Sequence, residues 1–133
     1  MRVVLDTNVL ISAFLFKGLA ADIYQYCFLS HSIHVSPWLL DEFAGILRKK
    51  FAIPEELLHT TVAHLRAGSI ITIPDGTLPD VCRDRDDNNL LQLAACCCAE
   101  FLVTGDQDLL VLQRHGETRI LSPREFWMLT RRQ

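Results

Sequence analysis

The sequence lacks an apolar run long enough to cross a bilayer, and its first residues lack the pattern of a secretory signal. These two absences predict a cytoplasmic protein that does not contact membranes. The chain also lacks an overall basic charge, because its net charge is −3 at pH 7. Two short basic stretches, Arg48-Lys49-Lys50 and Arg131-Arg132, are therefore interpreted as solvated surface.

Cysteine is present but in a pattern that excludes a disulfide framework. The five cysteines are an odd number, and Cys96, Cys97 and Cys98 are adjacent. Adjacent residues of a helix point in different directions, so this run cannot form paired bridges or a tetrahedral metal site. We expect all five, including Cys27 and Cys82, to be small buried hydrophobic residues in a reducing compartment.

The 133 residues, half of them hydrophobic, are enough for one domain (1–133) with a single core. The apolar patterns predict strands at 2–5, 33–35, 69–73, 101–104 and 119–121. They predict helices at 8–16, 19–29, 37–50, 54–68, 86–99 and 106–112, and a last helix that begins at the capping box of Ser122 and Glu125. Gly105 is expected to allow a tight exit from its strand. This alternation predicts a three-layer α/β/α sandwich around a mainly parallel sheet.

Two acidic residues follow predicted strands. Asp6 comes directly after the first strand, and Asp106 comes just after the strand "FLVT". Ligands of open parallel sheets gather at the carboxyl ends of the strands, and these two ends could lie side by side. A carboxylate that caps a helix would explain either residue alone.

A third acid lies on the apolar face of a predicted helix. Glu42 falls three residues after Leu39 and four before Ile46, within the stripe that faces the core, whereas its neighbour Asp41 faces solvent. An inward carboxylate is uncommon unless it is paired with a positive group or binds a cation. A salt-bridged core glutamate is the alternative.

The stretch "RDRDDNN" adds Asp84, Asp86 and Asp87 in front of a helix. Asp87 shares a helical stripe with Leu91, Ala94 and Cys98, and Asp86 shares another with Leu90, Leu93 and Cys97. Helical periodicity does not choose between them, and some of these acids would only cap the helix.

The converging carboxylates would repel one another and raise one another's pKa. A divalent cation relieves this repulsion, and oxygen ligands suit Mg²⁺ or Mn²⁺, whereas the absence of histidine from these motifs disfavours zinc. Such an ion activates water and holds phosphate oxygens, so the pattern points to phosphoryl transfer to water.

Four motifs in this order, "VVLDTNVLIS", "VSPWLLDEFAGIL", "RDRDDNNLLQLA" and "FLVTGDQDLLVL", resemble those of the PIN-domain family over nearly the whole chain. More narrowly, they resemble its branch of toxins from type II toxin–antitoxin systems, relatives of the VapC-like ribonucleases. The resemblance implies a metal-dependent endoribonuclease that hydrolyses RNA phosphodiester bonds. In relatives the third motif usually carries proline and a further aspartate, where this chain has Arg85 and Asn88.

The resemblance also implies roles for individual residues. One or two Mg²⁺ or Mn²⁺ ions would be held by Asp6, Asp87 and Asp106, and Glu42 would bind metal through water or orient the attacking hydroxide. The residues in supporting positions are Asn8, Thr104, Asp86 and Asp108. The choice of Asp87 over Asp86 or Asp84 is open at this point.

Partners follow from the same resemblance. It implies an RNA substrate, a small antitoxin protein laid across the acidic cleft, and a homodimer in which Trp38 or Trp127 contributes to the interface unless these residues are core. RNA would contact the Arg48-Lys49-Lys50 stretch or a groove shared by two subunits.

Other protein classes fit less well. A haloacid-dehalogenase-type phosphatase needs a second aspartate two residues after the first, where this chain has Asn8, and a receiver domain needs a lysine after its last strand. A PIN fold that has lost catalysis and only binds proteins is a further alternative, which a metal titration would separate from a nuclease.

Overall fold

The computed structural model of the chain describes residues 1–131. The strands are β1 (Arg2–Leu5), β2 (Ser32–Val35), β3 (Ile70–Ile71), β4 (Phe101–Val103), β5 (Arg114–His115) and β6 (Thr118–Leu121). The helices are α1 (Thr7–Leu15), α2 (Leu19–Ser30), α3 (Pro37–Lys49), α4 (Glu55–Ala67), α5 (Arg85–Cys96), α6 (Gln107–Leu110) and α7 (Pro123–Arg131). Within the described range, none of these helices has the length and apolar character needed to pass through a bilayer.

The strands form one six-stranded sheet in the order β3-β2-β1-β4-β6-β5. All neighbouring pairs are parallel except β5 and β6, which form an antiparallel hairpin. β1 is central, since Val3 is in register with Ile33 of β2 and with Phe101 of β4. Its residues Val3, Val4 and Leu5 have no exposed surface, as expected for a strand covered on both faces.

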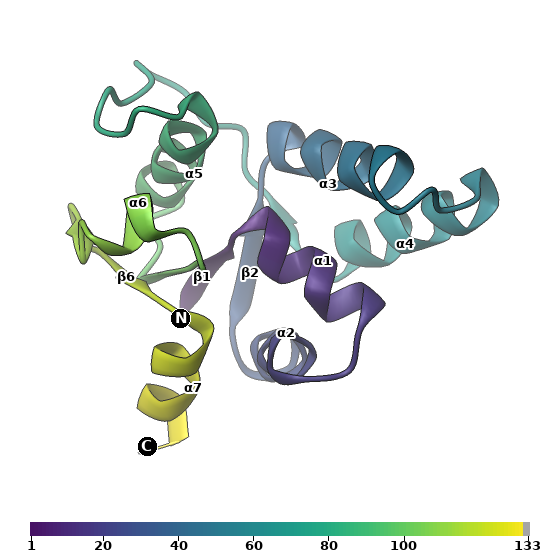
Figure 1. Cartoon of the computed structure of the whole chain (residues 1–133). Coiled ribbons are helices and arrows are strands. Elements are labelled where there is room, and N and C mark those ends of the chain that lie inside the picture. Colours follow the sequence, from purple (N-terminus) through teal and green to yellow (C-terminus); the bar gives the residue numbers. More distant parts are fainter. Residues whose placement is uncertain (132–133) are drawn as a thin grey trace.

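Helices cover both faces of the sheet (Figure 1). α5 and α6 lie on one side of the strands, and α1, α2 and α7 lie on the other side. α3 packs on α1, and α4 packs on α3. This arrangement confirms the predicted three-layer α/β/α sandwich with a mainly parallel sheet. The core between the layers is apolar, and its largest fully buried side chains include Phe43 and Phe126.

Local signals explain where several helices begin. The Ser36 hydroxyl accepts the backbone N–H of Leu39 at 3.1 Å, and Pro37 occupies the first turn of α3. The capping box at α7 forms as predicted, because Glu125 accepts the Ser122 N–H at 3.0 Å and the Ser122 hydroxyl accepts the Glu125 N–H at 3.1 Å.

The elements differ from the predictions mainly at the sheet edges. β3 is shorter than the predicted strand 69–73 because it pairs only with β2 and Pro74 follows closely. β5 was not predicted, and its hairpin turns at Gly116, whose φ is +58°. Gly105 lies between the end of β4 and Asp106, the N-cap of α6, as predicted for the exit from this strand, and its φ lies outside the left-handed region.

The cysteine prediction is wrong for three of the five residues. Cys27 and Cys97 are buried, but Cys82 is half-buried and Cys96 and Cys98 are exposed. For Cys98 the reason is that α5 ends at Cys96, so Cys98 lies in a turn with φ +56°, whereas Cys82 lies in the irregular segment before α5. All five thiols are free, in agreement with the absence of a disulfide framework.

The aromatic and basic residues singled out in the sequence lie on the surface or near it. Trp38 and Trp127 are half-buried against the core, and the Arg131 guanidinium carbon lies 4.0 Å from the Trp127 ring centre. Arg132 lies outside the described residues. In the other basic stretch, the Nε of Arg48 is 2.8 Å from an Oε1 oxygen of Glu55.

Candidate active site

The strand order places a switch point at β1 and β4. The chain proceeds from β1 outward to β2 and β3, and then returns to the other side of β1 to form β4. Ligands of such sheets bind in the crevice at the carboxyl ends of the two strands that flank the reversal. Asp6 follows β1 directly and its N–H donates to the Val103 carbonyl of β4 at 2.9 Å. The two strand ends are therefore side by side, as the sequence suggested.

Thr104 connects the acids that follow these two strands. Its hydroxyl donates to Oδ2 of Asp6 at 2.6 Å and accepts the backbone N–H of Asp106 at 3.0 Å. Thr104 has no exposed surface and Asp6 is only 8% exposed. A buried hydroxyl that both donates and accepts a hydrogen bond holds its two partners more firmly than an exposed hydroxyl would.

A pocket of about 200 Å³ collects the acidic side chains at this end of the sheet. Asp6 and Asn8 line it from the β1–α1 junction, and Glu42 lines it from α3. The remaining lining residues are Ile46, Asp84, Asp86, Asp87, Leu90 and Asp106. The structure therefore brings together acids from four separate parts of the chain.

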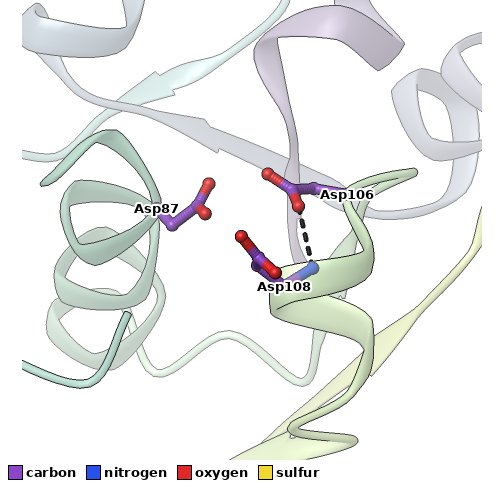
Figure 2. A group of neighbouring side chains, drawn as sticks. All are labelled: Asp87, Asp106 and Asp108. Atoms are coloured by element: carbon purple, nitrogen blue, oxygen red, sulfur yellow. Dashed lines mark hydrogen bonds between the residues drawn. The ribbon is translucent and has the colours of Figure 1, made fainter. Parts of the chain in front are cut away.

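Asp87, Asp106 and Asp108 form the tightest group. One carboxylate oxygen from each lies within 4.8 Å of the other two. Figure 2 shows the three carboxylates facing a common centre between α5 and α6. Asp106 caps α6, because its Oδ1 accepts the backbone N–H of Asp108 at 2.9 Å, and this contact orients the Asp106 side chain.

The structure distinguishes the three acids of the "RDRDDNN" stretch. Asp84 is exposed and caps α5, where its Oδ1 accepts the Asp86 N–H at 2.9 Å. Asp86 is exposed at the pocket rim. Asp87 is only 4% exposed, and its Oδ2 has no hydrogen-bond partner among the described residues. A buried carboxylate oxygen without a donor is costly, so this atom is the one that would gain most from a cation.

Glu42 projects from the apolar face of α3 as its spacing indicated. Leu39, Phe43 and Leu47 of that stripe are buried, Glu42 is half-buried, and Asp41 is exposed. The Thr7 hydroxyl donates to Oε1 of Glu42 and so joins the first turn of α1 to α3. No ion pair to Glu42 occurs within residues 1–131, so the salt-bridged alternative does not apply there.

Burial and mutual repulsion raise the pKa of three of these acids. Desolvation is the main cause for Asp87, whose pKa rises to about 7 with further contributions from Asp106, Asp84 and Asp6. Desolvation also raises the pKa of Asp6, although the Thr104 hydrogen bond opposes the rise. The pKa of Glu42 is raised by desolvation and by the Asp86 carboxylate, against the Thr7 hydrogen bond.

Two side chains near the site were missed by sequence reasoning. Thr7 orients Glu42, and nothing in its position within "LDTNV" marks it apart from Asn8, which is exposed. Asn88 is buried and binds the backbone of the loop before α5 through three hydrogen bonds with Val81 and Cys82. Asp108 lies closer to the centre than its supporting role implied.

The chemistry of the donor set fits a hard divalent ion. The close group offers carboxylate oxygens alone, and one of them is buried without a donor. Among residues 1–131, the cation within 4.0 Å of these carboxylates is Arg83, whose Nη2 is 3.7 Å from Oδ2 of Asp108. Because both side chains are exposed, this pair is weak and leaves the charge of Asp87 and Asp106 uncompensated.

Comparisons with known proteins place the chain in a family. A family model described as "PIN domain" matches residues 2–108. The chain is 30% identical over 141 residues to the uncharacterized protein MJ1680 of Methanocaldococcus jannaschii, in an alignment that covers 95% of this chain and 89% of that protein. A chain of the crystal structure of VapBC2 from Rickettsia felis, bound to a DNA fragment from their promoter, superposes with a TM-score of 0.66 at 15% identity, covering 92% of this chain and 98% of that one. The chain belongs to the PIN-domain family.

Proposed function

We propose that the chain, acting as one domain over residues 1–133, is a metal-dependent endoribonuclease that uses Mg²⁺ or Mn²⁺. The observation that carries this proposal is the meeting of Asp87, Asp106 and Asp108 oxygens within 4.8 Å, beside the buried Asp6. Uncompensated carboxylates at this density are held together at neutral pH most readily by a divalent cation. Membership of a family of nucleases supports the same reading.

Asp87, Asp106 and Asp108 would hold the ion directly, and Asp6 would complete the site from β1. When bound, the ion would polarise the phosphate and lower the pKa of a coordinated water. Thr104 keeps Asp6 and Asp106 in register, since its hydroxyl contacts both.

Glu42 is the proposed proton acceptor. In hydrolysis the water oxygen bonds to phosphorus, one phosphoester P–O bond breaks, and the leaving oxygen takes a proton from solvent. The proton lost by the water goes to the Glu42 carboxylate. Its pKa is raised by burial, which brings this carboxylate closer to the pKa range suited to general base catalysis at neutral pH. Thr7 holds it in place from α1.

The similarity of fold to a chain of the VapBC2 complex supports a proposal for the biological role. A chain with the same fold occurs in VapBC2, a complex bound to promoter DNA. We therefore propose that this protein is the toxin of a type II toxin–antitoxin pair in the cytoplasm, that it forms a homodimer, and that a small antitoxin covers the acidic pocket. Its partners would then be RNA, the antitoxin and a second copy of itself.

A panel of structured and single-stranded RNAs tests the activity. Wild type and Asp6→Asn would be incubated with each RNA in Mg²⁺, in Mn²⁺ and in EDTA, and the products separated on a denaturing gel. We expect cleavage by wild type that requires the ion and falls at least about a hundredfold in Asp6→Asn, as for removal of one electrostatic group of an active site. Metal-independent cleavage, or equal cleavage by the variant, would remove the mechanism. Absence of any cleavage would favour the catalytically inactive protein-binding module.

A further inference from the structure

A second pocket, of about 370 Å³, adjoins the start of α5. We call it the loop pocket; it is formed by the segment 77–83 and the first turn of α5. Its lining has two arginines and one acid, and consists of Thr77, Leu78, Pro79, Asp80, Cys82, Arg83, Arg85 and Asn88. Its size is in the range that small-molecule sites occupy, and polar side chains outnumber the apolar ones in its lining.

The loop pocket and the acidic pocket are both lined by the short stretch 83–88 at the start of α5. Residues Asp84, Asp86 and Asp87 line the acidic pocket, while Arg83, Arg85 and Asn88 line the loop pocket. The contact of Arg83 with Asp108 at 3.7 Å also joins the two. A group bound in the loop pocket would thus lie next to the proposed metal ligands.

The walls of the loop pocket are held in place by Asn88. Its Oδ1 accepts the N–H of Cys82 at 2.9 Å and of Val81 at 3.2 Å, and its Nδ2 donates to the Cys82 carbonyl at 2.9 Å. Asn88 is 5% exposed, so these bonds are protected from water on the side of the core. A loop fixed in this way needs little ordering when a ligand enters.

The two arginines are available to an anion. The side chain of Arg83 is 92% exposed, and its single carboxylate contact is longer than a hydrogen bond. Arg85 is exposed on the first turn of α5, where the positive end of the helix dipole also favours an anion. A guanidinium matches a phosphate in two parallel hydrogen bonds.

A polyanion that approaches the acidic pocket meets several negative charges. An ion held by the acids would offset this repulsion only for the phosphate beside it. Positive groups next to the acidic pocket are needed to offset the repulsion of the neighbouring phosphates. Arg83 and Arg85 line the adjoining loop pocket, where Arg83 also contacts Asp108, and the half-buried Leu78 and Pro79 offer an apolar surface for a ribose or a base.

We propose that the loop pocket binds the nucleotide next to the cleaved phosphodiester, with Arg83 and Arg85 contacting its phosphate. This inference rests on the proposed ribonuclease function and assigns the substrate side of that site to the segment 77–85. It places RNA at the start of α5 rather than at the Arg48-Lys49-Lys50 stretch at the end of α3.

The first test measures RNA binding without cleavage. Arg83→Ala/Arg85→Ala would be made in the Asp6→Asn background, and binding of a fluorescein-labelled single-stranded RNA in Mg²⁺ followed by anisotropy. We expect Kd to rise roughly tenfold or more, because charge-assisted contacts are lost. We also expect the slope of log Kd against log salt to fall by about 0.7 for each phosphate contact removed.

The matched control is Arg66→Ala/Arg124→Ala, which removes the same charge from exposed positions on α4 and α7. It should change Kd less than about twofold at physiological salt, because distant surface charges are screened. Arg83→Lys/Arg85→Lys retains the charge but loses the guanidinium groups that can make two parallel hydrogen bonds to a phosphate. It should therefore bind RNA with intermediate affinity. Equal losses in the control and the arginine variant, or failure of the Asp6→Asn protein to bind RNA, would overturn the proposal.

The second test uses the cleavage kinetics with Asp6 intact. The Arg83→Ala/Arg85→Ala variant should raise KM at least about tenfold with a smaller change in kcat. If wild type cleaves RNA and the variant cleaves with an unchanged KM, the loop pocket is not the subsite, while the ribonuclease proposal stands. If the variant changes only its Mn²⁺ affinity, Arg83 serves only to neutralise Asp108, and the inference is again wrong.

Discussion

Thr104 and Asp6 lie 98 residues apart in the chain, yet the Thr104 hydroxyl donates to Oδ2 of Asp6 at 2.6 Å inside the protein. The same hydroxyl accepts the N–H of Asp106 at 3.0 Å. One side chain therefore sets the position of both acids that follow the two central strands. This contact connects the sheet topology with the chemistry of the pocket, because it exists only when β1 and β4 are neighbours.

Replacing Thr104 with valine tests the importance of this contact. Thr104→Val keeps the shape of the side chain but leaves a buried carboxylate oxygen and the Asp106 N–H without their partner. We expect a loss of about 1–3 kcal/mol in the free energy of unfolding. The pKa of Asp6 should rise further, because the hydrogen bond that now opposes the rise is lost. Urea unfolding measures the first effect, and Thr104→Ser should restore most of the stability. An unchanged midpoint in Thr104→Val would show that the bond is not significant.

The pH dependence of stability reports on Asp87. Its carboxyl has a reference pKa of 3.8 and a pKa of about 7 in the folded chain. A group whose pKa is raised by folding stabilises the folded state below the unfolded pKa, and that contribution is lost as the pH rises through about 7. Without metal, Asp87→Asn should therefore have a higher Tm than wild type at pH 8, by at least about 3 °C, which corresponds to roughly 1 kcal/mol in a chain of this size.

Differential scanning calorimetry in EDTA measures this difference. It should shrink toward pH 4, where wild-type Asp87 is protonated and resembles the amide. The control is Asp41→Asn, whose side chain is exposed on α3 away from the pocket. If the Tm of Asp87→Asn equals or falls below the wild-type value at pH 8, then burial and the neighbouring acids do not destabilise the ionised Asp87 carboxylate as inferred.

Asn88 provides a test of how the loop before α5 is held. Asn88→Ala removes three hydrogen bonds to Val81 and Cys82 and leaves their backbone groups to water. We expect faster amide hydrogen exchange in the segment 77–83 and a stability loss of about 1–2 kcal/mol, since the loop is partly exposed. Asn89→Ala, one position further on the same helix, is the control. Exchange rates that remain the same in Asn88→Ala would show that other contacts hold the loop.

Much of the site was predictable because it depends on repeating patterns. A buried strand followed by an acid predicts a carboxylate at the carboxyl end of the sheet, and this reasoning located Asp6 and Asp106. The spacing of Glu42 within the apolar stripe of α3 predicted its inward direction without reference to any partner. The same patterns predicted the layers of the fold, since alternating strands and helices have few ways to bury their apolar faces.

Other features depend on contacts that no pattern records. Periodicity could not choose among Asp84, Asp86 and Asp87, because the choice depends on where α5 begins; Asp84 caps the helix, and Asp87 is the residue that turns inward. Asp108 lies close to Asp87 and Asp106 through its place in the short helix α6, which Asp106 caps. The roles of Thr7 and Asn88 require contacts with segments that lie elsewhere in the chain or in an irregular loop.

Isothermal titration with Mn²⁺ tests the central claim most directly, which is that a divalent ion neutralises the acids gathered at the ends of β1 and β4. We predict saturable binding by wild type at pH 8 that weakens as the pH falls below 7, because protons compete for Asp87. Asp87→Asn and Asp106→Asn should each weaken binding at least about tenfold, as loss of a charged ligand implies, while Asp41→Asn should bind like wild type. Absence of saturable binding, or equal affinity in all four proteins, would contradict the account.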